Sequence, residues 1–299
     1  MNFTVTNDFD GRLLRDFLIR GISLSRALYT ELKKRGGILV NGLPVTVRHC
    51  LRAGDTVTLA LADTDADLDP SLTAWDVPLD ILYEDAHILA VNKPPYMPTH
   101  LSHGHRADTL ANALKAEFDR RGERFVMRAV NRLDADTSGV VLIAKNRYAA
   151  DRFSGANLSY EKRYLAICHG EAPDTGELRG YIRRVAESII TRAVFAEGKD
   201  SEAAHTRFRT LARGGGFSAV ECEPVTGRTH QLRVHLASIG HPIVGDDLYG
   251  GGALLPRQAL HAFSLSLVHP ITGEALTLTA PLPTDMEDFL KQHEIPCIL

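Results

Sequence analysis

The start of the chain alternates hydrophobic and polar positions in ways that predict short elements. Hydrophobic side chains recur at helical spacing over residues 13–18, and a second helix is expected to begin at Ser25 and to stop at Gly36-Gly37. The Asn41-Gly42 pair then marks a hairpin, because both residues accept the positive φ angles of a tight turn. A strand over residues 57–61 closes a unit of two helices and three strands.

An acidic stretch with few hydrophobic positions, residues 62–77, is interpreted as a linker that the repulsion of its carboxylates keeps extended. Beyond it, strands are predicted over residues 81–83, 88–91, 140–144, 164–167, 189–195, 206–211, 217–223 and 275–279. Helices are predicted over residues 109–121, 147–153 and 230–239. The chain is therefore expected to have an α+β fold, with a small N-terminal domain and a larger, mainly antiparallel sheet with flanking helices.

The net charge of −3 conceals an uneven distribution of charged residues. Residues 1–60 contain nine Lys or Arg against five Asp or Glu, whereas residues 61–80 contain six Asp and no basic residue. A weakly acidic total taken alone argues against a nucleic-acid partner. A chain made of a basic unit, an acidic connector and a near-neutral remainder remains compatible with a nucleic-acid partner.

Several classes of protein are disfavoured by the sequence. The start has neither a basic nor an apolar targeting segment, and no run reaches the roughly 18 apolar residues of a membrane span. The four cysteines form no Cys-x-x-Cys pair, so a cytoplasmic protein with reduced thiols is expected. Phosphate-binding glycine motifs are absent, and no Cys or carboxylate completes a metal site around His100, His103 and His105. Neither a nucleotide cofactor nor a metal is expected.

The run from Asn131 to Gly139, Asn-Arg-Leu-Asp-Ala-Asp-Thr-Ser-Gly, places a carboxylate beside an arginine just before a predicted strand. An aspartate beside a guanidinium stays ionised at neutral pH, and an ionised carboxylate can attack or stabilise an electron-poor carbon. Most such pairs are surface or structural ion pairs, so the run alone does not decide. Asp134 is nevertheless the first candidate for a catalytic residue.

Three further segments give this run a context. They are residues 91–94 (Val-Asn-Lys-Pro), 162–166 (Lys-Arg-Tyr-Leu-Ala) and 227–235 (Gly-Arg-Thr-His-Gln-Leu-Arg-Val-His). In their order and spacing, the chain from about residue 79 to its C-terminus resembles the RluA/RluD-type pseudouridine synthases. These enzymes isomerise uridine to pseudouridine in structured RNA. The family usually has a histidine just before Arg-Leu-Asp, where this chain has Asn131.

The resemblance implies three catalytic residues. Asp134 acts at C1′ or C2′ of the sugar, and Arg233 forms a salt bridge to it. Tyr164 stacks on the flipped base, or its hydroxyl is instead the group that removes the C5 proton. Without the resemblance, a tyrosine in a strand would be interpreted as a residue of the hydrophobic core. The candidate RNA contacts around this site are Arg132, Lys93, Arg228, His230 and Gln231.

The N-terminal elements resemble the S-four-type RNA-binding domain. The expected organisation is an S-four-type domain over residues 1–61, an acidic linker over 62–77 and a pseudouridine synthase catalytic domain over 78–299. The RNA contacts expected in the first domain are Arg26, Lys33, Lys34 and Arg35. The alternative is that these four residues form only a solvated helix face.

The predicted function is isomerisation of specific uridines in ribosomal or transfer RNA by a monomer that needs no cofactor and no membrane. One alternative is a catalytically silent RNA-binding or ribosome-assembly protein of the same fold, against which the intact Asp134, Tyr164 and Arg233 speak. Another is a glycosidase-like hydrolase. That chemistry requires a second carboxylate near Asp134, and Asp136 is the only local option.

Overall fold

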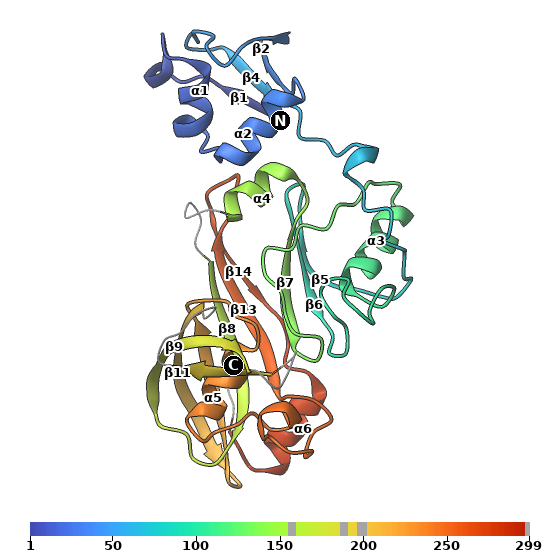
Figure 1. Ribbon diagram of the computed structural model, residues 1–299, viewed down its shortest axis with the longest axis vertical. Helices are drawn as coiled ribbons and strands as arrows, with labels where there is room; N and C mark the ends of the chain where they lie inside the picture. The colour runs from blue at the N-terminus through green and yellow to red at the C-terminus, as the bar shows by residue number, and fades with distance from the viewer. Residues whose placement is uncertain (155–159, 186–190, 196–201, 297–299) are drawn as a thin grey trace.

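The computed structural model describes residues 1–154, 160–185, 191–195 and 202–296. Within them the chain forms two sheets, a small one near the N-terminus and a large one in the rest of the molecule. Figure 1 shows residues 1–61, here called the N-terminal module, at one end of the molecule, facing α4 and the ends of the long strands. Residues 78–296 are called the body.

The N-terminal module has the predicted elements and one more strand. Its elements are β1 (Asn2–Thr4), α1 (Leu14–Asp16), a π-helical turn (Phe17–Gly21), α2 (Arg26–Lys34), β2 (Ile38–Val40), β3 (Leu43–Pro44) and β4 (Thr56–Leu59). Ser25 caps α2 as expected, since its Oγ accepts a hydrogen bond from Leu28 N at 3.1 Å. Asn41 and Gly42 have φ angles of 51° and 78°, which confirms the tight turn. The unpredicted strand, β1, pairs with β4 at the sheet edge.

The body is built on one mixed sheet. Its strands are β5 (Asp80–Glu84), β6 (Ile88–Lys93), β7 (Ser138–Ala144), β8 (Tyr160–His169), β9 (Thr175–Arg184), β10 (Arg192–Phe195), β11 (Glu202–Gly214), β12 (Phe217–Pro224), β13 (Leu260–Val268) and β14 (Ala275–Thr279). Their order is β10-β9-β11-β12-β8-β13-β7-β6-β5, with β14 paired to β13. Every pair is antiparallel except β7 with β13. The predicted α+β class with a mainly antiparallel sheet is confirmed.

Helices lie around this sheet in Figure 1. They are α3 (Leu110–Arg120), α4 (Arg147–Ser154), α5 (Gln231–Ser238) and α6 (Thr284–Gln292). The first three were predicted, and α6 was missed. Among the described residues, no helix is long and apolar enough to cross a lipid bilayer.

Two long strands, β9 and β13, escaped the sequence analysis. β9 has charged residues at Glu177, Arg179, Arg183 and Arg184, a pattern that is typical of a polar connection. β13 is interrupted by a histidine and two serines, although it lies between β8 and β7 in the middle of the sheet. The strand predicted over residues 189–195 is observed as β10, and its first two positions lie outside the described residues.

The parallel pair of β7 and β13 explains the Ser-Gly that ends the Asn131–Gly139 run. Gly139 pairs with Ala262 and has a φ of 116°, and a Cβ placed there would lie 2.2 Å from the Ala262 carbonyl oxygen. Only glycine permits this approach. The preceding Ser138 donates its hydroxyl to His261 Nδ1 across the same pair, at 2.9 Å.

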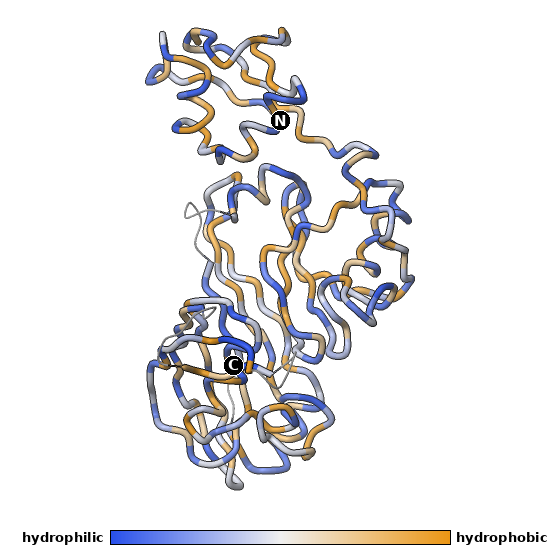
Figure 2. Tube along the Cα trace, in the orientation of Figure 1, coloured by the Kyte–Doolittle hydropathy of each residue, from blue (hydrophilic) through white to orange (hydrophobic). Residues whose placement is uncertain are grey.

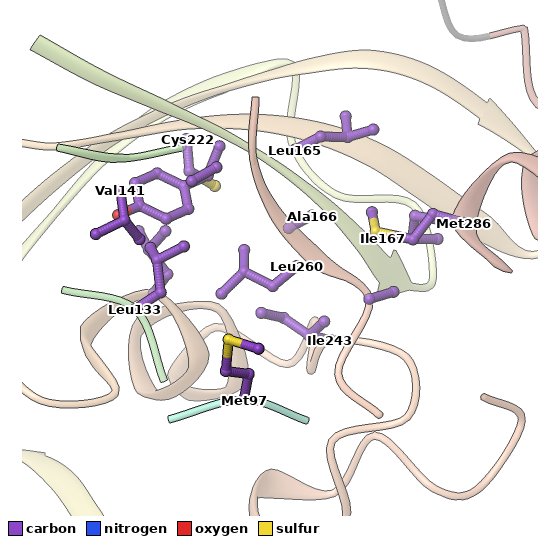
Figure 3. Close-up of a cluster of buried hydrophobic side chains, with 14 of the residues drawn as sticks. Met97, Leu133, Val141, Leu165, Ala166, Ile167, Cys222, Ile243, Leu260 and Met286 are labelled. Atoms are coloured by element: carbon purple, nitrogen blue, oxygen red, sulfur yellow. The ribbon is translucent and has the colours of Figure 1, made fainter. Parts of the chain in front are cut away.

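The interior of the body supports the backbone next to Asp134. Figure 2 shows hydrophobic stretches along several strands of the large sheet. Met97, Leu133 and Leu260 belong to the main hydrophobic cluster and lie close together in Figure 3. Burial of Leu133 fixes the backbone of the residue that follows it, Asp134.

Residues 62–77 are mostly exposed, but ion pairs hold part of this stretch against the body. Asp63 and Asp67 both form ion pairs with Arg147 of α4, at 3.3 Å and 2.5 Å. Further along, Leu72 is buried in the main hydrophobic cluster. The expected repulsion between the carboxylates of this stretch is therefore offset, because arginines of the body and the module neutralise two of them.

The N-terminal module also shares buried side chains with the body. Tyr148 of α4 belongs to the hydrophobic cluster of the module, and its hydroxyl donates to the Ile22 carbonyl at 2.8 Å. The Ser25 backbone N–H donates to Asp151 Oδ2 of α4 at 2.7 Å. The α2–α4 contact therefore joins the two parts by hydrophobic and polar interactions.

Candidate active site

Asp134 lies in a tight turn that leads into β7. Its own carbonyl accepts a hydrogen bond from Thr137 N at 3.1 Å, and Thr99 Oγ1 donates to the neighbouring Leu133 carbonyl at 2.8 Å. With its backbone held from both sides, the Asp134 side chain remains 30% exposed. It is thus a fixed carboxylate that a ligand can reach.

Arg233, predicted as the partner of Asp134, is confirmed in that position. It lies on α5 with its Nη1 3.3 Å from Asp134 Oδ2. A second carboxylate, Asp246, binds the same guanidinium through two hydrogen bonds of 2.7 Å and 2.8 Å. Burial alone would lower the pKa of Arg233, but the two carboxylates outweigh it and raise the pKa, so the guanidinium stays charged.

His230 faces the same carboxylate from the N-terminus of α5. Its Nε2 lies 3.9 Å from Asp134 Oδ2, and its Nδ1 is 2.9 Å from the hydroxyl of Tyr249. The residue has a φ of 56°, which is unusual for a side chain with a Cβ and is held here by the surrounding contacts. Burial lowers the pKa of His230, although the Asp134 carboxylate opposes the shift.

A cavity of about 90 Å³ opens in front of these groups. Its lining includes Arg132, Asp134, Lys162, Tyr164, His230 and Arg233. Tyr164 on β8 is 7% exposed, and it belongs both to the hydrophobic core and to the cavity wall. Burial, reinforced by the Asp134 carboxylate, raises the pKa of its hydroxyl, so the phenol is protonated at neutral pH. An uncharged aromatic ring beside a carboxylate suits the binding of a flat, neutral base.

Lys93 was predicted to contact RNA, and this is wrong because its side chain is fully buried. Its ammonium donates to the carbonyls of Pro94, Met97 and Ala135 at 2.8, 2.8 and 2.9 Å. Burial lowers the pKa of Lys93 to about 7, opposed by the nearby Asp134 and Asp136 carboxylates. Lys93 therefore fixes the backbone directly after Asp134.

Gln231 was also expected to contact RNA; its side chain is buried, yet it contributes to the lining of the cavity. Its Nε2 donates to the His205 carbonyl at 2.9 Å, and its Oε1 accepts from Thr226 Oγ1 at 2.7 Å. The nearby Arg228 also lines the cavity and forms an ion pair with Glu202 at 2.8 Å. Gln231 joins α5 to β11, while Arg228 stays at the cavity edge.

The basic residues of the N-terminal module differ in their surroundings. Arg26, Lys33 and Lys34 are exposed. Arg35 forms ion pairs with Glu31 and Asp67 at 3.3 Å and 2.8 Å, so its charge is already partly compensated. Of the four predicted RNA contacts, Arg35 is the least available.

Asn131, which replaces the family's usual histidine, has a structural task. Its Nδ2 donates to the Val140 carbonyl at 2.9 Å, and its Oδ1 accepts from Leu142 N at 2.8 Å. The amide thereby hydrogen-bonds the backbone of β7 like a short extra strand. It does not line the cavity that contains Asp134.

Sequence reasoning missed Asp246, Tyr249 and Lys162 as parts of this site. Asp246 and Tyr249 are brought to Arg233 and His230 only by folding, so no local motif indicates them. Lys162 begins a segment that was recognised, but only its tyrosine was assigned a role. No group of three or more His, Cys, Asp or Glu in the described residues is placed to hold a metal ion.

The comparisons with known proteins agree with this geometry. A family model described as RNA pseudouridylate synthase matches residues 87–238. The uncharacterized RNA pseudouridine synthase YjbO of Bacillus subtilis (strain 168) is 40% identical over 275 residues, 90% of this chain and 95% of that protein. The ribosomal large subunit pseudouridine synthase D of Xanthomonas campestris pv. campestris is 36% identical over 285 residues, which cover 88% of this chain and 83% of that protein. Human RNA pseudouridylate synthase domain containing 1 superposes with a TM-score of 0.56 at 30% identity, covering 68% of this chain and 83% of that one.

Proposed function

Because this chain belongs to the RNA pseudouridine synthase family, of the RluA type, we propose that it isomerises specific uridines of structured ribosomal RNA, with Asp134 as the group that acts on the sugar. The ribosomal substrate is supported by relatives that are named ribosomal large subunit pseudouridine synthase D. The enzymatic activity itself follows from the family. The particular RNA and the roles of single residues are the proposal.

The reaction rearranges one nucleoside without an outside reactant. The C1′–N1 bond breaks, the uracil turns while it stays bound, and a C1′–C5 bond forms. The proton on C5 leaves and N1 gains one, so neither an oxidant nor a leaving group is required. The site needs an anionic group near C1′ and a surface that retains the free uracil.

Asp134 meets the first need, and its 3.3 Å contact with Arg233 inside an open cavity is the observation that supports the assignment most directly. Two routes use the same carboxylate: attack on C1′, or removal of the C2′ proton to give a glycal. Both routes require the ionised carboxylate. Asp136 does not line the cavity, so a two-carboxylate hydrolase has no support.

Tyr164 meets the second need. A uridine must leave the RNA stack before its glycosidic bond can be reached, and an aromatic face compensates for the stacking that is lost. The raised pKa of the Tyr164 hydroxyl disfavours it as a base at neutral pH, so we assign the ring to stacking. A silent RNA-binding protein would need neither this ring nor the fixed Asp134 beside it.

The N-terminal module, residues 1–61, is proposed to bind RNA as an S-four-type domain through Arg26, Lys33 and Lys34. Residues 62–77 join it to the catalytic part, residues 78–299. We propose that the protein acts as a monomer.

The test of the catalytic assignment compares two neighbouring carboxylates. Asp134→Asn should lower the single-turnover rate of pseudouridine formation by about a thousandfold or more, with RNA affinity little changed, since only the anion can act at the sugar. Asp136→Asn, outside the cavity lining, is the matched control and should stay within a few-fold of wild type. A residual rate of Asp134→Asn within tenfold of wild type would overturn the assignment.

The substrate is tested by mapping pseudouridine in total RNA from cells that carry either wild type or Asp134→Asn. The expected result is loss of one or a few sites in ribosomal RNA. If pseudouridine were lost only from transfer RNA, transfer RNA would be the substrate in place of ribosomal RNA. If the pseudouridine map were unchanged, neither RNA would be the substrate.

A further inference from the structure

A second cavity of about 250 Å³ adjoins the one that contains Asp134. Its lining includes His100, Asn131, Arg132, Tyr160, Lys162 and Gly227. Arg132, Lys162 and Gly227 line both cavities, so the two form one continuous cleft. A nucleotide bound at Asp134 would therefore have its neighbour in the second cavity.

The second cavity is basic, and no ion pair compensates its charges within the described part of the chain. No carboxylate belongs to its lining, and neither Arg132 nor Lys162 forms an ion pair with any residue in the described part of the chain. Arg163, the next residue on β8, instead pairs with Glu161 and Glu221. A partly buried ammonium without a counter-ion is unfavourable, and a bound anion would relieve that cost.

The Lys162 ammonium is held in a defined place. Its Nζ lies 5.5 Å from the centroid of the Tyr160 ring, and that ring is fixed because its hydroxyl donates to the Val130 carbonyl at 3.0 Å. Gly227 is also close, since a Cβ at that position would come within 3.7 Å of Nζ. Arg132 is anchored by its Nη2, which is 3.3 Å from Thr229 Oγ1.

We propose that Lys162 and Arg132 bind the phosphodiester group that joins the target uridine to its neighbour, and that the second cavity receives this neighbouring nucleotide. The proposal rests on the proposed function of the adjoining cavity. RNA places a phosphate directly beside each nucleoside, and the Asp134 carboxylate repels it, so the phosphate belongs on the side without carboxylates. The fork of an arginine and the point charge of a lysine both suit phosphate oxygens.

The test measures RNA affinity across salt concentrations in the Asp134→Asn background, where no turnover occurs. The probe is an in vitro transcript of large-subunit ribosomal RNA. Lys162→Met keeps an unbranched side chain, one heavy atom shorter, and removes the charge. It should weaken affinity about tenfold at low salt and reduce the salt slope by roughly 0.7, the value for one phosphate contact on single-stranded RNA.

Two variants make the result specific. Lys162→Arg should restore most of the affinity and the slope, because it returns a cation to the same place. Arg163→Met removes an equal charge from the adjacent, ion-paired position and should leave both nearly unchanged. If Lys162→Met does not fold, Lys162→Gln makes the same measurement. The proposal would be overturned if the salt dependence of RNA affinity had the same slope in Lys162→Met (or Lys162→Gln) as in the Asp134→Asn protein that carries Lys162.

Failure of this inference is distinguishable from failure of the proposed function. If the wild type forms pseudouridine but Lys162→Met binds RNA with an unchanged slope, only the phosphate site is wrong. If the wild type forms no pseudouridine while the slope falls as expected, the phosphate site stands and the proposed reaction is wrong.

Discussion

At the scale of single residues, the guanidinium of Arg233 contacts two unequal carboxylates. Asp246 is fully buried at its side chain and makes two short hydrogen bonds, whereas Asp134 is 30% exposed and makes one at 3.3 Å. The buried partner sets the orientation of the arginine, and the exposed partner remains available to a substrate. Asp246 is thus a positioning residue for Asp134.

Asp246→Asn should slow pseudouridine formation by about a hundredfold while RNA affinity changes little. The amide keeps the shape of the side chain but not its charge, so Arg233 loses its stronger partner and its orientation. The free energy of unfolding should also fall by about 3 kcal/mol, because a buried charge has lost its counter-ion. Single-turnover kinetics and chemical denaturation measure the two effects.

A suitable control for Asp246→Asn is Glu84→Gln. Glu84 pairs with Arg121 and Lys145 on the β5 side of the sheet, outside the cavity. That variant should lose stability without a change in the single-turnover rate. A normal rate in Asp246→Asn would show that Arg233 is positioned without it.

At the scale of elements, β7 and β13 are joined by a buried polar contact. His261 accepts from Ser138 at Nδ1 and donates from Nε2 to the Ala280 carbonyl at 3.3 Å, an arrangement that only the neutral imidazole satisfies. Burial lowers the pKa of His261 to about 4. The contact therefore stabilises the centre of the sheet only while the imidazole is uncharged.

Acidification should weaken the protein through this contact. The pKa of His261 in the folded protein, about 4, is below the value of roughly 6.5 in the unfolded chain, so the unfolded chain binds the proton first. The stabilisation is complete above about pH 6.5 and is lost as the pH falls toward 4. His261→Gln should reduce the loss of unfolding free energy in this window by about 2 kcal/mol, as measured by urea denaturation. If the unfolding free energies of wild type and His261→Gln changed equally with pH, His261 would not contribute to the loss of stability in acid.

At the scale of the whole molecule, the N-terminal module is attached to α4 while its basic residues face outward. The contact involves Tyr148, Asp151 and Arg147 of α4, whereas Arg26 and Lys34 are exposed. Binding of RNA by these residues would therefore not require the module to leave the body.

Replacing Arg26, Lys33 and Lys34 together by Gln should weaken RNA affinity and lower its salt slope by roughly 0.7 to 0.9 for each phosphate that is no longer bound. The rate at saturating RNA should not change, because the cavity at Asp134 is untouched. Filter binding and single-turnover kinetics on long structured RNA measure both quantities.

An equal loss of charge elsewhere provides the comparison. Lys115, Arg120 and Arg124 form ion pairs with acidic neighbours, and their joint replacement by Gln should leave the salt slope nearly unchanged. If the two triple variants have equal slopes, the basic residues of the module are only solvated surface.

What the sequence alone determined was local or motif-based. The cap at Ser25 and the Asn41-Gly42 turn depend on a few adjacent residues, whose backbone preferences act before any tertiary contact exists. Asp134, Tyr164 and Arg233 were found because each lies in a recognisable segment. The structure adds that all three line one cavity.

Only the tertiary structure decided the environment of each charge. Lys93 has a charged side chain, but folding buries it and turns an expected RNA contact into internal hydrogen bonds. The acidic residues of 62–77 meet arginines that lie up to 84 positions away, and Asp134 lies 99 positions from Arg233. The energy of a charge depends on its burial and its partners, and partners so distant in sequence leave no local pattern to read.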